Sequence, residues 1–183
     1  MPPKELVVLL DDAFSPIGTA DKATLHNHNT PLHLAFSCYV FNSQQQLLLT
    51  RRALHKIAWP GVWSNSFCGH PLPEEVFTAA VARRAGDELG LALQHIQPIF
   101  DEFSYYARDS NGIVEHEFCP IFAAQAAGEV NAVAAEVDQY QWVDFARLLQ
   151  AVEHQAFLFS PWMVQQLLHP NIARGLKDYQ AQI

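Results

Sequence analysis

Three histidines and two glutamates are the residues of this sequence best suited to bind a metal ion. Glu115 and Glu117 are two positions apart in a segment expected to be a β-strand, so both carboxylates leave the same face. His26, His33 and His70 offer imidazole nitrogens. Such a mixed nitrogen and oxygen set suits Mn²⁺, Zn²⁺ or Fe²⁺, and Mg²⁺ less well. The spacing matches no zinc-finger motif, so a surface or core role for each histidine remains the alternative.

A second group of charged residues has the order of a helix that binds divalent cations. It resembles the Nudix box, Gly-x5-Glu-x7-Arg-Glu-U-x-Glu-Glu-x-Gly-U, in which U is a bulky aliphatic residue. The matching positions are Gly69, Glu75, Arg83, Glu88 and Gly90. Arg84 stands where the box has a glutamate, and Asp87 replaces the first glutamate of the terminal pair. An arginine in place of a metal-binding carboxylate argues against hydrolysis. The alternative is a surface helix with the i,i+4 pairs Arg83–Asp87 and Arg84–Glu88.

Hydrophobic patterning and turn residues predict an α+β fold around these side chains. A helix is expected from Pro73 to Leu89, with Gly90 as its C-terminal cap. Asp144 is expected to cap a helix over 145–152, and Pro161 to begin another over 161–168. The strands are expected over 6–10, 33–41, 46–50, 99–107, 114–123 and 140–143.

Composition limits the possible functions. The 183 residues, half of them hydrophobic, fit one domain over 1–183. A net charge of −8 argues against nucleic-acid binding, which needs a basic face for the phosphates. Three widely spaced cysteines favour a reducing environment. With no apolar run of membrane-spanning length and no signal-like start, we expect a cytoplasmic protein without membrane contact.

Beyond these features, the sequence has the run from Asn65 to Pro71, with its Cys-Gly-His core, and the Glu-x-Glu pair at Glu115 and Glu117. These elements are specific to the type I isopentenyl-diphosphate Δ-isomerase family, which the sequence resembles. The matching blocks occur in the order of the family: 33–37, 51–54, 59–71, 105–107, 112–117 and 160–163. The resemblance implies a Nudix fold of mixed β-sheets flanked by helices. It places the Nudix-like core at about 30–168, between a short N-terminal strand and a C-terminal helical tail.

The resemblance also implies a chemistry: isopentenyl diphosphate is protonated to a carbocation, and loss of a different proton gives dimethylallyl diphosphate. Cys68 and Glu117 would be the acid–base pair, with Tyr105 hydrogen-bonded to Glu117. We expect Glu117 to protonate the terminal methylene and Cys68 to remove the allylic proton. Trp162 would present its ring to the carbocation, because cation–π attraction is strongest for tryptophan.

The remaining expectations concern ligands. By resemblance, His26, His33, His70, Glu115 and Glu117 hold one divalent metal, Mn²⁺, Zn²⁺ or Mg²⁺. The diphosphate would be held by four cations, with a Mg²⁺ bridging to Glu88; these cations are Lys22, Arg52, Lys56 and Arg84. A monomer and a homodimer both remain open. The rival interpretations are a Nudix hydrolase of a nucleoside diphosphate derivative and a catalytically silent metal-binding or partner-binding module.

Overall fold

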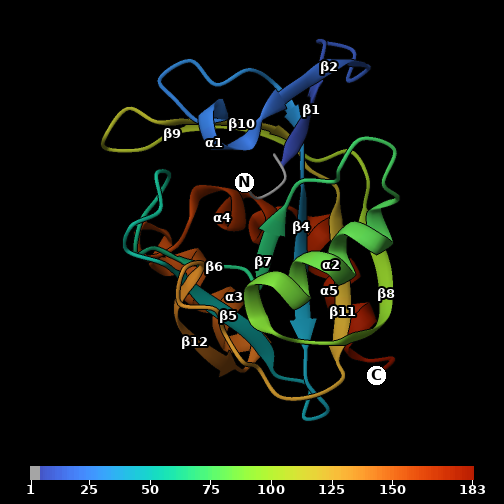
Figure 1. Cartoon of the computed structure of the whole chain (residues 1–183). Helices are drawn as coiled ribbons and strands as arrows, with labels where there is room; N and C mark the ends of the chain where they lie inside the picture. The colour runs from blue at the N-terminus through green and yellow to red at the C-terminus, as the bar shows by residue number, and fades with distance from the viewer. Residues whose placement is uncertain (1–4) are drawn as a thin grey trace.

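Two β-sheets form the framework of the chain, with the smaller sheet at one end of the larger (Figure 1). The computed structural model describes residues 5–183. The smaller sheet has the order β2 (Pro16–Asp21), β1 (Leu6–Leu10), β3 (His33–Leu34), β10 (Val114–Phe118) and β9 (Ser104–Arg108). The larger has the order β12 (Val137–Val143), β5 (Leu47–Arg52), β4 (Phe36–Phe41), β11 (Ile121–Ala126) and β8 (Leu93–Phe100), with β6 (Trp63–Ser64) on β5 and β7 (Phe67–Gly69) on β4. The expected α+β fold with mixed sheets is confirmed.

The chain passes between the two sheets where the sequence predicted unbroken strands. The strands expected over 33–41, 99–107 and 114–123 are each interrupted, and each half joins a different sheet. Two of these crossings run side by side, because β3 pairs in parallel with β10 and β4 pairs in parallel with β11. Pro120 lies at one crossing and has no N–H for a ladder hydrogen bond, which favours a break there. Because of these crossings, the polar side chains of the smaller sheet lie at one end of the larger sheet.

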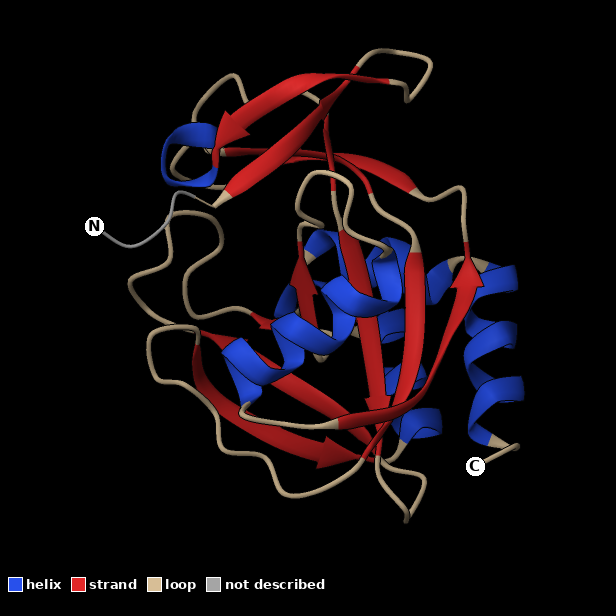
Figure 2. Cartoon of the chain, turned by 45° about the vertical axis from the view of Figure 1, so that its right-hand side comes forward, coloured by secondary structure: helices blue, strands red, loops and turns tan. Residues whose placement is uncertain are grey.

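Helices cover both faces of the larger sheet (Figure 2). On β4, Phe36, Cys38 and Val40 belong to the core cluster under α2 (Phe77–Leu89). Tyr39 and Phe41 point to the opposite face, where they join the second core cluster. Burial on both sides explains why β4 reads as a continuous apolar run. The second face is covered by α3 (Phe145–His154), α4 (Pro161–Leu168) and α5 (Pro170–Gln180); the two remaining short elements are α1 (Lys22–Leu25) and the 3₁₀ turn η1 (Ala156–Leu158).

Most helix boundaries agree with the sequence, but one start was wrong. Gly90 adopts φ +55° as the cap of α2, and the Asp144 side chain accepts a hydrogen bond from the Arg147 amide at 2.9 Å. Helix α2, however, begins at Phe77 rather than Pro73. Glu74 has a positive φ of 64°, which a right-handed helix does not allow. The proline therefore shapes a turn before the helix instead of starting it.

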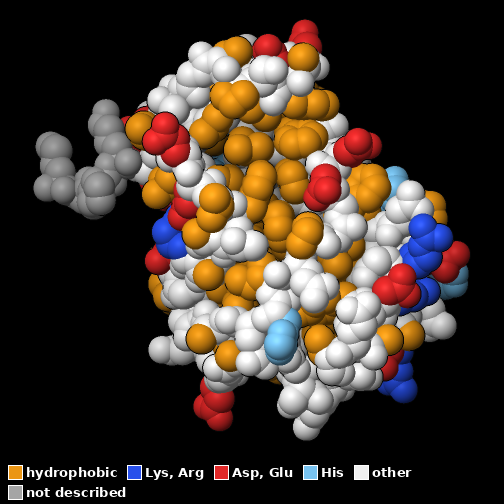
Figure 3. All heavy atoms as spheres, turned by 90° about the vertical axis from the view of Figure 1, so that its right-hand side faces the viewer, with side chains coloured by type: hydrophobic (Ala, Val, Ile, Leu, Met, Phe, Trp, Pro, Cys, Tyr) orange, Lys and Arg blue, Asp and Glu red, His pale blue; other side chains and the backbone are white. Residues whose placement is uncertain are grey.

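No helix within residues 5–183 suits a membrane span, and lysine and arginine are sparse on the face drawn in Figure 3. Within residues 5–183, none of the helices has both the length and the apolar character to cross a bilayer. On the face drawn in Figure 3, hydrophobic side chains spread across the middle, while lysine and arginine are few and lie at the margins.

Candidate active site and metal centre

A cavity of about 570 Å³ collects side chains from both sheets and from three helices. Its volume is in the usual range for small-molecule sites. All of the predicted catalytic, metal-binding and phosphate-binding residues line it except His33, whose Nε2 lies 3.4 Å from Glu117 Oε1. Those lining residues are Lys22, His26, Arg52, Lys56, Cys68, His70, Arg84, Glu88, Tyr105, Glu115, Glu117 and Trp162.

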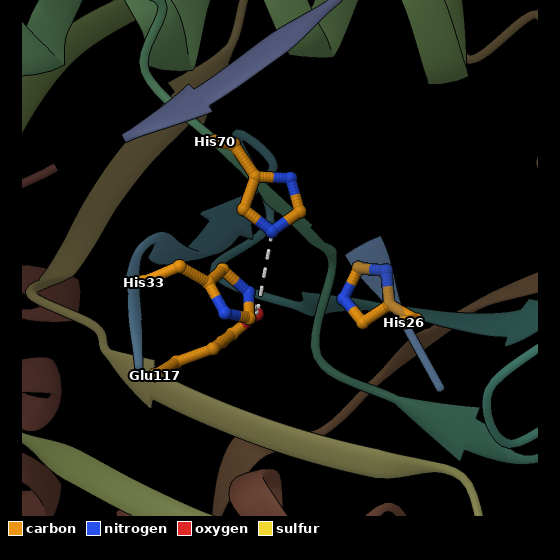
Figure 4. Close-up of side chains that lie close together, drawn as sticks. All are labelled: His26, His33, His70 and Glu117. Atoms are coloured by element: carbon orange, nitrogen blue, oxygen red, sulfur yellow. Dashed lines mark ion pairs between the residues drawn. The ribbon is translucent and has the colours of Figure 1, made fainter. Parts of the chain in front are cut away.

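The histidines and Glu117 converge at one end of this cavity (Figure 4). One ligand atom from each of His26, His33, His70 and Glu117 lies within 4.8 Å of all the others. His33 and Glu117 are register partners on β3 and β10, whereas His26 follows α1 and His70 follows β7. Glu115 lies outside this tight group, but its Oε2 approaches His26 Nε2 at 3.0 Å. Separate elements thus bring four of the five expected ligands together and place the fifth beside them.

The protonation of the cluster suits a metal ion. The Nδ1–H of His33 lies 2.9 Å from the Pro31 carbonyl, which leaves the Nε2 lone pair directed at the cluster. The buried Nε2 atoms of His26, His33 and His70 lie 3.0–3.4 Å from oxygens of Glu115 or Glu117, but these contacts lack hydrogen-bond geometry. Burial lowers the pKa of His70 to about 3, so its ring is neutral near pH 7. Buried imidazole nitrogens beside two carboxylates fit a divalent cation.

We expect removal of divalent metal to destabilise the protein. A metal present at about 100 times its dissociation constant adds about 2.7 kcal/mol to the stability. For a chain of this length that corresponds to a Tm shift of about 5–10 °C. Thermal unfolding with a chelator, and after adding metal back, measures the shift. His33→Ala should lose it, while His28→Ala should keep it, because His28 contacts the Gly112 carbonyl and lies outside the cluster. Equal Tm values with and without metal would contradict a metal centre.

The Cys68 thiol lines the cavity from β7 and is held by two polar side chains. Ser37 Oγ lies 3.3 Å and Asn65 Nδ2 3.4 Å from its sulfur. Burial, and then the charge of Glu117, raise the pKa of Cys68 to about 12, so the thiol is neutral at pH 7. The other two cysteines, Cys38 and Cys119, are fully buried in the two core clusters. Of the three, Cys68 alone lines the cavity.

The two oxygens of Glu117 have different surroundings. Oε1 lies 3.4 Å from Nε2 of both His33 and His70, whereas Oε2 accepts a 2.9 Å hydrogen bond from the Tyr105 hydroxyl. Burial alone would raise the pKa of Glu117, but its contacts with the two histidines outweigh this and hold the pKa well below its usual range. Burial raises the pKa of Tyr105 well above its usual range, so the phenol keeps its proton. One carboxylate oxygen therefore faces the metal-binding cluster and the other faces a proton donor.

Trp162 brings an aromatic ring to the same cavity. Its indole N–H lies 3.0 Å from both Ser64 Oγ and Asn65 Oδ1, which fixes the orientation of the ring at the start of α4. The Arg52 guanidinium carbon lies 5.4 Å from the ring centroid, within cation–π range. The ring face is therefore already beside a cation.

The four expected phosphate-binding cations line the cavity, and three of them pair with carboxylates. Lys22 Nζ lies 2.9 Å from Glu5 Oε1, Lys56 contacts Glu136, and Arg84 contacts Glu88. Arg84 also lies 3.9 Å from Glu5 and 3.8 Å from Glu136. The sequence analysis did not identify Glu5 and Glu136, because nothing in one sequence marks a single acidic residue in a strand edge or loop as part of a site.

The chain is similar to a known domain family and to curated proteins along most of its length. The NUDIX domain model matches residues 31–163. An "Isopentenyl-diphosphate Delta-isomerase" of Clavibacter sepedonicus is 52% identical over 181 residues, covering 97% of this chain and 95% of that protein. The protein of the same name from Klebsiella pneumoniae is 48% identical over 179 residues, covering 98% and 97%. The expected core limits of about 30 and 168 stay a prediction.

Solved structures with a similar fold are more distant in sequence. A Deinococcus radiodurans structure aligns with a TM-score of 0.62 at 18% identity, covering 82% of this chain and 90% of that one. A MutT protein of Methanosarcina mazei aligns with a TM-score of 0.58 at 16% identity, covering 81% and 96%. These likenesses concern the fold.

Proposed function

We propose a mechanism for a chain that belongs to the isopentenyl-diphosphate Delta-isomerase family and carries a NUDIX domain. The protein converts isopentenyl diphosphate to dimethylallyl diphosphate. This reaction needs one group that gives a proton to the alkene and another that takes a proton from the neighbouring carbon. The observation that carries our assignment is that the thiol of Cys68 and the carboxyl of Glu117 line one cavity.

Glu117 is the acid and Cys68, as the thiolate, is the group that removes the second proton. The pKa directions place the proton on Cys68 rather than on Glu117 before substrate binds, so the proposal includes transfer of one proton from the thiol to the carboxyl when the substrate enters the cavity. The Glu117 oxygen that contacts Tyr105 is the one that delivers a proton to the terminal methylene, and the phenol stabilises the carboxylate that remains. The carbon–carbon π pair forms the new C–H bond and leaves a tertiary cation. Loss of an allylic proton to the Cys68 thiolate then forms its S–H bond and returns the C–H electron pair to the new double bond. Ser37 and Asn65 contact that sulfur at 3.3 and 3.4 Å.

Trp162 stabilises the cation between these two proton transfers. Its ring is buried, with 2% exposed, and packs against Trp59 and Tyr105 with centroid distances of 5.4 and 6.0 Å. An aromatic face in a site with little water attracts a carbocation more strongly than it would in solvent. The same packing keeps away water that would trap the cation as an alcohol.

His26, His33, His70, Glu115 and Glu117 would hold one divalent metal, Mn²⁺, Zn²⁺ or Mg²⁺. When bound, the metal supplies a positive charge that orients Glu117 and adjusts its proton affinity. The cluster supports this proposal because its imidazole nitrogens are buried and free to ligate. Tyr105 keeps the other Glu117 oxygen turned toward the cavity.

The diphosphate would bind where four cations line the cavity, at Lys22, Arg52, Lys56 and Arg84. Substrate phosphates replace the carboxylates of Glu5 and Glu136 as partners of these cations. Glu88 would hold a Mg²⁺ carried by the diphosphate, which would supply further positive charge beside the phosphates. The position of Arg84 beside Glu88 supports this arrangement, because the arginine gives the phosphates a counter-charge where a hydrolase would have another carboxylate.

A hydrolase is the alternative, favoured only by the box-like helix α2. We expect purified protein with isopentenyl diphosphate, divalent metal and reductant to form dimethylallyl diphosphate and to release no phosphate. Chromatography of the diphosphates and a colorimetric phosphate assay on the same samples measure both products. Phosphate release without isomerisation, or nucleoside monophosphate from a nucleoside diphosphate derivative, would decide for the hydrolase.

A further inference from the structure

Three fully buried polar side chains lead from the protein core to the sulfur of Cys68. Ser37 and Tyr39 project from the same face of β4, and Gln166 reaches them from α4. All three have 0% of their surface exposed. Buried polar groups are costly unless satisfied, and apolar side chains of similar volume often stabilise a core better. A chain of polar groups that ends at a thiol of the active cavity therefore points to a role beyond packing.

The hydrogen bonds that link these three side chains run in one direction. The Tyr39 hydroxyl donates to Gln166 Oε1 at 2.7 Å, so the amide nitrogen faces the other way. Gln166 Nε2 then donates to Ser37 Oγ at 2.9 Å. Because that donation occupies a lone pair of Ser37, the serine keeps its own proton for a sulfur acceptor. Its two sulfur neighbours are Cys68 at 3.3 Å and Cys119 at 3.4 Å.

Asn65 contacts the same sulfur from a second direction. The indole N–H of Trp162 can only donate, and it contacts Asn65 Oδ1 at 3.0 Å. The amide nitrogen of Asn65 therefore faces the other way, where it donates to the Phe67 and Cys38 carbonyls at 2.8 and 3.2 Å and lies 3.4 Å from Cys68 Sγ. Because these carbonyls take both amide hydrogens, Ser37 is left as the hydroxyl donor beside the sulfur, and the thiol can itself donate to Asn65 Oδ1 at 3.5 Å.

We propose that Tyr39 and Gln166 are positioning residues that act through Ser37 to orient the Cys68 sulfur toward the substrate. This inference rests on the proposed role of Cys68. Without the Tyr39 hydroxyl, no donor on that side holds the Gln166 amide oxygen in place. A flipped amide would accept the Ser37 proton, and the sulfur would lose the Ser37 hydroxyl as a donor.

A pair of tyrosines gives a matched test. Tyr39 and Tyr179 lie in the same core cluster, are 0% and 2% exposed, and each donates one short hydrogen bond; that of Tyr179 goes to the His95 carbonyl at 2.8 Å. Tyr39→Phe and Tyr179→Phe should therefore lower the Tm by similar amounts. We expect Tyr39→Phe alone to lower kcat, by about tenfold, with KM unchanged. Gln166→Met should lower kcat similarly.

A readout that does not depend on turnover separates this proposal from the proposed function. The S–H stretching band of Cys68 can be assigned by the infrared difference between the wild type and Cys68→Ser. We expect Tyr39→Phe to move this band and Tyr179→Phe to leave it in place. Equal kcat values and unmoved bands in both variants would overturn the positioning role. A wild type with no isomerase activity would contradict the proposed function, while the band would still decide whether Tyr39 orients the thiol.

Discussion

Cys68→Ala is expected to lower kcat by about three orders of magnitude or more, within the range that a positioned acid or base contributes and beyond any effect of packing. Cys68 is only partly buried, and the change removes one sulfur from the cavity wall, so the protein should remain folded. Conversion of isopentenyl diphosphate under reducing, metal-replete conditions measures the loss, and circular dichroism checks the fold.

Cys38→Ala is the matched control for this variant. Cys38 is fully buried beneath α2, in the other core cluster, and does not line the cavity. We expect it to lose some stability through the small void that it leaves, and to keep kcat within a few-fold of the wild type. If Cys68→Ala turned over as fast as Cys38→Ala, the thiol would have no part in the reaction.

Glu117→Gln is expected to lower kcat by about two to four orders of magnitude, because an amide has the shape of the carboxyl but cannot deliver the proton. Glu117 also belongs to the proposed metal centre, so the metal content of the variant must be measured by elemental analysis. A variant that retains metal and lacks activity isolates the proton-transfer role.

Glu115→Gln is the control for Glu117→Gln. Glu115 also leaves β10 toward the cluster, but it contacts His26 rather than Tyr105. We expect a smaller loss of kcat, accompanied by weaker metal binding. Turnover of Glu117→Gln at the wild-type rate would remove the carboxyl from the mechanism.

The sequence predicted which residues lie together around the cavity better than it predicted the path of the chain between the sheets. Glu115 and Glu117 share a face because side chains alternate along any strand, whatever sheet the strand joins. The break of the strands over 33–41 and 114–123 depends instead on two sheets meeting at an angle. Apart from Pro120, no residue of these two segments marks the break, so unbroken strands were expected.

Residues without a distinctive local signal were the ones that sequence reasoning missed. Gly69 belonged to a recognised motif, and the structure adds why: a Cβ there would lie 2.7 Å from Arg84 Cγ and 2.8 Å from Phe36, so glycine lets β7 pack directly against α2. Tyr39 and Gln166, in contrast, look like ordinary core and helix residues. Only the packing of α4 on β4 reveals that they lead to Cys68.

The account is tested most directly by running the isomerisation in heavy water and following the product by NMR. Because Glu117 delivers a solvent-derived proton to the terminal methylene, we predict one deuterium in a methyl group of each dimethylallyl diphosphate formed early in the reaction. Dimethylallyl diphosphate formed without deuterium would mean that hydrogen passes within the substrate, and would contradict a mechanism built on a separate acid and base.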